Sequence, residues 1–318
     1  MEPAVCTGPV GYKPDAMNFE FVRKFQCKLH RRSLDDPNRK FDDLWNLLHD
    51  ERTLRAAWWK LRKNRGSRTP GIDGLTAKKV EALPGGIKGF IQETHTLLKT
   101  GKYRPTPTGR RWIPKSGNKL RPIDIAIIRD RLVSMALQMV LTPIFEPDAR
   151  PSSHGFRPRR DTWSAINQIR ELLLEEDGET HIIEGDIVSC FNRFVIRRIM
   201  RALRKRIGDK RVLSLIKEFL IVGTIDAGTH IPGTRGTPQG FIPSPTIANI
   251  FLTQMDAHRA DRGYDYVRFA DDFVIIVRGT REDAERVKED IAEYLATIGL
   301  ELSETKTLIT RPEHGFVF

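Results

Sequence analysis

The chain has 318 residues, of which 39% are hydrophobic and 30% are charged, so it is long enough to bury a sizeable core. Its 53 Lys and Arg exceed its 41 Asp and Glu, and the formal net charge of +12 favours a polyanionic partner, with nucleic acid as the first candidate. No apolar run is long enough to span a bilayer, and the N-terminus lacks the basic start and apolar block of a signal peptide, which argues against a membrane or secreted protein. We therefore expect an intracellular protein.

The first 75 residues are predicted to form an N-terminal extension. Four prolines and little apolar periodicity indicate an irregular arm up to about residue 40. Apolar residues at helical spacing then predict basic helices within residues 41–63. The basic side chains of this stretch form either an ordinary solvated face or a surface that contacts nucleic-acid phosphates. They are Arg52, Arg55, Lys60, Arg62, Lys63 and Arg65.

A hairpin is the clearest feature of residues 76–180. Short apolar pieces within residues 110–123 flank a turn at residues 115–118. Lys115 and Arg121 lie at its tip and on its arm, where an exposed hairpin commonly carries solubilising charge. The alternative is a clamp in which the two side chains converge on a triphosphate.

A strand with an acidic residue near its end is predicted within residues 181–191. Glu184 and Asp186 share one face of this strand, and Asp186 is the better ligand candidate because it lies nearer the end. The chain is then basic and helical over about residues 195–230, which offers either a solvated face or a surface for a nucleic-acid backbone. The basic residues at the start of this insertion are Arg197, Arg198 and Arg201.

Two adjacent carboxylates, Asp271 and Asp272, interrupt an apolar, β-forming run at residues 264–277. This pattern predicts a hairpin with the acid pair at or beside its turn, although the pair taken alone is also typical of a solvated turn. A capping box at residues 280–283 then begins an apolar helical stripe that ends at Gly299. The succession of strand, hairpin, helix and strand predicts a split βαβ sheet with helices packed on one face.

Asp186 would supply a third carboxylate if its strand lies beside the acidic hairpin. Three carboxylates favour Mg²⁺, a hard cation that seeks oxygen ligands and keeps open positions for phosphate. Metal binding would also remove their mutual repulsion. Two such ions can activate an attacking 3′-hydroxyl and stabilise a leaving pyrophosphate.

The ordered motifs resemble the reverse transcriptases encoded by bacterial and organellar group II introns. The resemblance covers about residues 68–318, and the matching segments occur in the order of the family. These segments are residues 68–74, 113–123, 129–165, 186–191, 236–245, 269–272 and 302–307.

The resemblance implies an α+β fold of right-hand polymerase type, with fingers at residues 76–180 and a palm at residues 181–318. The palm would contain a ferredoxin-like antiparallel sheet backed by helices. Asp186, Asp271 and Asp272 would be the catalytic residues and the ligands of two Mg²⁺ ions. The residues implied to contact the nucleotide are Lys115, Arg121, Phe191, Gln239 and Lys306, of which Phe191 would pack where a ribose 2′-hydroxyl would lie.

The function implied by the resemblance is RNA-directed DNA synthesis, in which deoxynucleoside triphosphates are added to a DNA primer on an RNA template. Family members also bind their group II intron RNA as splicing maturases, in the bacterial cytoplasm or an organelle matrix. The oligomeric state stays open, with a dimer through the fingers as one option. The alternatives are a splicing factor that keeps the fold without using it, and a related reverse transcriptase of a defence, CRISPR-associated or diversity-generating system.

The sequence departs from the family pattern at several positions. Phe269 replaces the commoner Tyr, and Asn192 stands where Asp is frequent. Phe241 replaces a second Gly and is expected to crowd the primer or nucleotide side of its loop. Family members continue past residues 315–318 into a helical thumb and further domains, so we expect this chain to be part of a longer protein.

Overall fold

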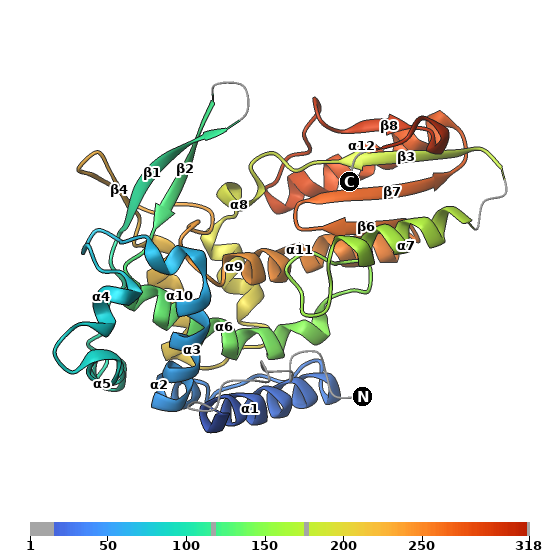
Figure 1. The fold of residues 1–318 in the computed structure, drawn as a ribbon. Helices are drawn as coiled ribbons and strands as arrows, with labels where there is room; N and C mark the ends of the chain where they lie inside the picture. The colour runs from blue at the N-terminus through green and yellow to red at the C-terminus, as the bar shows by residue number, and fades with distance from the viewer. Residues whose placement is uncertain (1–15, 116–118, 175–177, 317–318) are drawn as a thin grey trace. The chain divides into compact units, whose positions relative to one another are not determined.

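The computed structural model describes residues 16–115, 119–174 and 178–316, and it divides into two compact units. Unit 1 comprises residues 1–147 and 196–244, and unit 2 comprises residues 148–195 and 245–318. Each unit is thus built from two separate stretches of the chain, whose elements are drawn in Figure 1. The basic insertion expected at residues 195–230 belongs to unit 1.

Unit 1 combines a group of helices with a four-stranded sheet. Its elements are α1 (Ala16–Asp35), α2 (Trp45–His49), α3 (Glu51–Lys63), α4 (Ala77–Glu81), α5 (Gly86–Lys99), β1 (Thr108–Lys115), β2 (Lys119–Ile125), α6 (Ile128–Phe145), α9 (Ile196–Leu203), α10 (Lys210–Ile221), β4 (Thr224–Asp226) and β5 (Thr229–Ile231). Helix α6 is buried along nearly its whole length and packs against α1, α2 and α3. Such burial is expected of a helix that is apolar around its circumference.

Helix α1 shows that the expected irregular arm was wrong over Ala16–Asp35, whereas residues 36–40 are irregular. Its buried residues recur every three or four positions, and this stripe packs against α6 and α3. Three stripe positions, Gln26, His30 and Ser33, are polar, which obscured the period. The Gln26 side-chain amide donates to the Met139 carbonyl oxygen at 2.9 Å, and the Ser33 hydroxyl donates to the Ile144 carbonyl oxygen at 2.5 Å. The four prolines that suggested an arm all lie outside this helix.

The sheet of unit 1 has the strand order β2-β1-β4-β5. Strands β1 and β2 form the predicted hairpin, which is antiparallel as far as the pair Lys115 and Lys119. Of the turn predicted at residues 115–118, Lys115 is the last residue of β1, and residues 116–118 lie outside the described residues. Strand β1 also pairs in parallel with β4 through Thr108 and Thr224, so the insertion contributes strands that the sequence did not predict.

Unit 2 is built on a second four-stranded sheet, with the order β6-β7-β3-β8 and antiparallel pairing throughout. Its elements are α7 (Thr162–Leu174), β3 (Thr180–Gly185), α8 (Cys190–Arg193), α11 (Ser244–Asp261), β6 (Asp265–Phe269), β7 (Asp272–Arg278), α12 (Arg281–Ile298) and β8 (Leu308–Thr310). Helix α12 begins with the predicted capping box at Thr280 and Asp283, ends at the predicted Gly299, and packs against β3, β7 and β8.

Helices cover both faces of this sheet, so the expectation of one covered face was wrong. Val267 and Val274 face Ala165 of α7 in a shared apolar cluster. Tyr266, one position along β6, points to the opposite face, where its hydroxyl donates to Asp256 of α11 at 2.8 Å. The physical reason is visible in β7, whose continuous apolar run is typical of a strand buried on both sides.

Within residues 16–115, 119–174 and 178–316, no helix is both long enough and apolar enough to span a membrane.

Candidate active site

The predicted acidic hairpin is present in unit 2 and turns sharply between β6 and β7. Phe269 pairs with Asp272, so Ala270 and Asp271 alone make the turn. Ala270 has a φ of 62°, a left-handed conformation that two-residue hairpin turns usually give to Gly or Asn. Asp271 is partly buried and Asp272 is exposed. The turn therefore presents both carboxylates from a strained backbone.

Asp186 follows directly after β3, which lies beside β7 in the sheet. Gly185 pairs with Phe273, and one further step in this antiparallel register brings Asp186 level with Asp272. A Cβ atom on Gly185 would lie 2.1 Å from the Phe273 ring, so only glycine fits there. The Ser303 amide donates to the Asp186 carbonyl oxygen at 2.8 Å and ties it to the C-terminal segment.

The three carboxylates influence one another electrostatically. Burial and then the charge of Asp186 raise the pKa of Asp271. Burial, followed by the charges of Asp271 and Asp186, raises the pKa of Asp272. Lys306 counters this repulsion, because its Nζ lies 3.1 Å from both carboxylate oxygens of Asp186.

The donor set suits a hard divalent cation, because it consists of carboxylate oxygens whose repulsion such an ion would relieve. Within the described part of the chain, however, no three His, Cys, Asp or Glu side chains converge closely enough to hold a metal ion. The Asp186 carboxylate instead forms an ion pair with the Lys306 ammonium. A bound cation would thus have to displace the Lys306 ammonium from Asp186, because the three carboxylates do not form a ready metal site in this conformation.

A buried arginine that we did not predict holds the turn from behind. Arg268 is fully buried, and its guanidinium forms a two-pronged ion pair with Asp256, at 2.8 and 2.7 Å. It also donates to the Ala270 carbonyl oxygen at 2.7 Å and to the Ser153 hydroxyl at 2.7 Å. Although burial opposes its charge, the Asp256 carboxylate raises the pKa of Arg268. Its signal in the sequence is a lone arginine within an apolar strand.

The loop before α7 adds a short segment to the free edge of β6. Ser153 and Arg268 form a parallel bridge, in which the His154 amide donates to the Arg268 carbonyl oxygen and the Arg268 amide donates to the Ser152 carbonyl oxygen, both at 2.8 Å. Gly155 then lies against the turn, where an added Cβ atom would be 2.3 Å from the Ala270 nitrogen. This loop therefore buttresses the acidic turn.

Phe191 lies in α8, five positions after Asp186, and is partly buried. Its ring meets the edge of Phe156 at 6.3 Å between centroids and lies 6.1 Å from Phe194. Phe156 is 52% exposed and has a φ of 60°, which is a strained conformation for a bulky residue. Phe191 and Lys306 both belong to unit 2, as do Asp186, Asp271 and Asp272.

The other predicted nucleotide contacts lie in unit 1. Lys115 and Arg121 are on the two arms of the β1–β2 hairpin, and Arg121 is exposed. Gln239 is exposed in the loop after β5. Phe241 is buried and stacks on Phe219 at 4.7 Å, so the expectation that its ring crowds the loop's open side was wrong.

The basic residues predicted to bind RNA are all in unit 1, and several are already paired. Arg52, Arg55 and Arg62 form ion pairs with Asp50, Glu51 and Glu81, respectively. Arg55 and Arg198 are partly buried, and the others are exposed: Arg52, Lys60, Arg62, Lys63, Arg65, Arg197 and Arg201.

Arg206, further along the same basic stretch, is a structural residue. It is 2% exposed and donates to the carbonyl oxygens of Asp36 and Ser33 at 2.9 and 2.8 Å. It therefore ties the stretch after α9 to the end of α1.

Comparisons with known proteins agree with this architecture. The family described as "Reverse transcriptase (RNA-dependent DNA polymerase)" matches residues 113–318. Protein YkfC of Escherichia coli (strain K12) is 33% identical over 93% of this chain and 87% of its own length. The group II intron-encoded protein LtrA of Lactococcus lactis subsp. cremoris is 28% identical over 89% of this chain. This chain spans 57% of LtrA.

Among solved structures, telomerase from Candida tropicalis in complex with a fragment of telomeric RNA is similar in fold. The TM-score is 0.51 at 15% sequence identity, over 68% of this chain and 43% of that protein. This likeness agrees with the expected α+β fold of right-hand polymerase type. The chain therefore belongs to the reverse transcriptase (RNA-dependent DNA polymerase) family.

Proposed function

We propose that this chain is the polymerase part of an RNA-directed DNA polymerase, with unit 2 as its palm and unit 1 as its fingers. It would add deoxynucleotides to the 3′-hydroxyl of a primer paired with an RNA template. The observation that carries the proposal is the register of β3 against β7, which sets Asp186 level with the Asp271-Asp272 turn. The raised pKa values of Asp271 and Asp272 support it, because burial and then the charges of neighbouring carboxylates raise them.

Reverse transcriptases use divalent metal ions, and we propose that Asp186, Asp271 and Asp272 hold two Mg²⁺ ions here. When bound, these ions would activate the primer hydroxyl and stabilise the leaving pyrophosphate. Arg268 and the Ser152–Gly155 segment would keep the turn fixed while the carboxylates bind. Lys306 would leave Asp186 and offer its ammonium to the nucleotide phosphates.

The remaining contacts to the nucleotide follow from the family resemblance. Lys115 and Arg121 would bind the triphosphate, and Gln239 would meet the nucleotide or the template strand. The Phe191 ring, supported at its edge by Phe156, would exclude a ribose 2′-hydroxyl and so favour deoxynucleotides. These assignments rest on motif position, together with the exposure of Arg121 and Gln239.

Group II intron RNA is the RNA partner that the relatives suggest, since LtrA is a group II intron-encoded protein. We propose that the chain also binds its intron RNA as a maturase, through the exposed basic residues of unit 1. The net charge of +12 supports a large electrostatic share in that binding. A dimer through the fingers remains part of the proposal.

Primer extension tests the enzymatic proposal. The full chain is given a DNA primer on an RNA template, deoxynucleotides and Mg²⁺, and is compared with Asp271→Asn/Asp272→Asn. The double variant should lose at least about 100-fold in rate, because several kcal/mol of transition-state stabilisation would disappear. Asp265→Asn, at the start of β6, is the control and should retain activity. Synthesis that survives loss of the acid pair would refute the assignment.

A further inference from the structure

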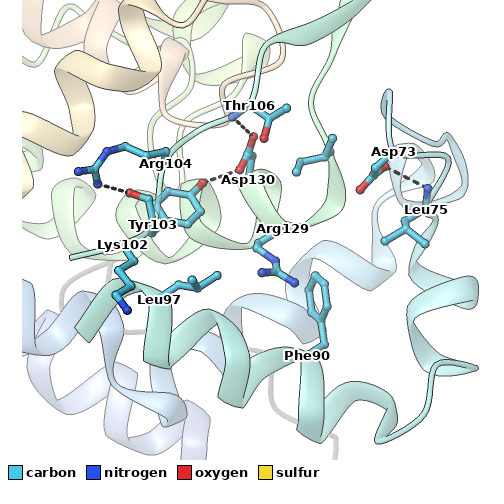
Figure 2. Close-up of a pocket in the computed structure, with 11 residues that line it drawn as sticks. Asp73, Leu75, Phe90, Leu97, Lys102, Tyr103, Arg104, Thr106, Arg129 and Asp130 are labelled. Carbon is cyan, nitrogen blue, oxygen red and sulfur yellow. Dashed lines mark hydrogen bonds between the residues drawn. The ribbon is translucent and has the colours of Figure 1, made fainter. Parts of the chain in front are cut away.

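Unit 1 contains a pocket that the proposed polymerase reaction does not use. It lies between α5, the segment that follows α5, and the start of α6, and has a volume of about 340 Å³. Figure 2 shows Arg129 and Asp130 projecting into it from neighbouring positions of the chain, with Phe90 on one side and Tyr103 on the other. This volume lies within the range of ligand sites, about 300–1,000 Å³.

Arg129 forms a flat, fixed surface in this pocket. Both of its terminal nitrogens donate to the Glu93 carboxylate at 2.8 Å, which fixes the guanidinium plane. The guanidinium carbon lies 5.1 Å from the centroid of the Phe90 ring, and the Arg129 side chain is 23% exposed. A planar ligand can therefore stack on the guanidinium, as unpaired RNA bases do on arginine.

Asp130 supplies hydrogen-bond acceptors next to this surface. Its carboxylate is 1% exposed and accepts from the Tyr103 hydroxyl at 2.6 Å and from the Thr106 amide at 2.8 Å. A carboxylate can accept about four hydrogen bonds, so each oxygen retains capacity for another donor. Burial raises the pKa of Asp130 to about 6, even though both of these hydrogen bonds act to lower it. Near neutral pH the group is therefore an acceptor.

The rest of the pocket suits a nucleotide rather than a purely apolar ligand. Leu75 and Leu97 contribute apolar walls, and both are partly buried. Lys102 and Arg104 are exposed at the pocket and carry positive charges that can bind a phosphate. The pocket thus combines a stacking surface, a buried acceptor and nearby cations.

We propose that this pocket binds one unstacked base of a single-stranded RNA, with the base on the Arg129 guanidinium and its amino edge toward Asp130. The inference rests on the proposed RNA partner but not on polymerisation. Cytosine fits this arrangement because its exocyclic amine donates to a carboxylate, whereas uracil presents a carbonyl oxygen at the same position. A strand of cytosines should therefore bind better than a strand of uracils.

The test measures equilibrium binding of fluorescent ten-nucleotide strands of cytosine or uracil at pH 8 without Mg²⁺. The two strands carry the same charge, so their difference reports base contacts. The cytosine strand should bind roughly tenfold more tightly to the wild-type chain, as expected for one stacked and hydrogen-bonded base. Arg129→Lys keeps the positive charge but removes the planar guanidinium on which the base would stack. This variant should bind the cytosine and uracil strands with affinities that differ by no more than about twofold.

Two further variants complete the experiment. Leu97→Glu places a negative charge in the pocket wall without altering Arg129, and it should remove the preference as well. Lys88→Gln removes one exposed charge from α5 outside the pocket, and it should weaken both strands equally while the preference remains. Thermal unfolding identifies any variant that fails to fold. If either Arg129→Lys or Leu97→Glu fails to fold, the binding preference of the other variant tests the pocket.

The outcomes separate this inference from the proposed function. Equal binding of the two strands by the wild-type chain, or a preference that survives both pocket variants, would overturn the base pocket and leave the RNA partner intact. Failure of the full chain to bind either strand would refute the RNA partner and the pocket with it.

Discussion

Arg268 couples the acidic turn to the buried side of the sheet through one side chain. Its guanidinium contacts an acid in α11, the loop at Ser153 and the backbone of the turn at Ala270. An arginine provides this because its planar fork can donate in several directions at once. The position of the proposed catalytic carboxylates therefore depends on a buried arginine behind the turn.

Arg268→Ala should destabilise the fold by about 3–5 kcal/mol, because it leaves the Asp256 charge buried without its partner. Urea denaturation measures this change. Arg278→Ala in the neighbouring strand β7 removes a partly exposed pair with Asp265 and should cost only about 1 kcal/mol or less. Equal losses in the two variants would contradict the role assigned to Arg268.

Asp130 should give the protein a measurable pH dependence of stability. Its pKa is about 6 in the folded chain against an ordinary value of 3.8, so the folded state binds the proton more tightly than the unfolded state. Its contribution is therefore fully present below about pH 4 and is lost as pH rises through about 6, by roughly 3 kcal/mol in total.

Asp130→Asn tests this dependence, because an amide can still accept from the Thr106 amide and donate to the Tyr103 hydroxyl. Between pH 4 and 6, the free energy of unfolding of the wild type should fall relative to that of the variant. Parallel curves for the two proteins would show that Asp130 titrates normally.

Between elements of unit 2, the Ser152–Gly155 segment and the hairpin turn are in close contact at Gly155 and Ala270. Gly155→Ala should disrupt it, since the added methyl group would lie 2.3 Å from the Ala270 nitrogen. We expect a loss of primer extension of at least about tenfold, because small displacements of catalytic groups are costly. Gly263→Ala is a matched control for a glycine in open space, although its φ of 70° predicts a small loss of stability.

Local signals in the sequence predicted the elements that carry them. The acidic hairpin and the two ends of α12 appeared where expected, because turn and capping residues act over a few positions. Helix α1 was missed because polar side chains occupy part of its buried stripe. The second covered face of the unit 2 sheet was missed because it depends on α7, which is distant from β6 in the chain.

At the scale of the whole molecule, the charge of the chain should appear as salt-dependent RNA binding. Arg197, Arg201 and Arg204 are exposed and recur at helical spacing, so they can meet one phosphate backbone. Replacing all three with Gln should reduce the slope of log affinity against log salt by about 2, at roughly 0.7 per lost phosphate contact. A filter-binding series over salt concentration measures this slope.

Arg52→Gln/Arg62→Gln is the control for that series, because both side chains already pair with acids. This variant should change the slope less than the triple variant does. If the triple variant had the same slope as the wild type, Arg197, Arg201 and Arg204 would form an ordinary solvated surface that does not contact RNA phosphates.

Contacts between elements distant in the chain could not be predicted from the sequence. Asp186, Asp271 and Asp272 could be proposed as one group because an ordered set of motifs contains them. The supporting residues Arg268 and Asp256 could not, since their pairing depends on how α11 packs on β6. Each unit also joins two distant stretches, which no local pattern reveals.

The Ser152–Gly155 segment also affects how strand β6 could associate with another molecule. Strand β6 is the last named strand on its side of the sheet, and an exposed edge of this kind can recruit a strand from another chain. Here the backbone amide and carbonyl of Arg268 are both occupied by the loop. These two groups of β6 are therefore unavailable to a strand from a neighbouring copy, and the loop that supports the acidic turn also covers part of that edge.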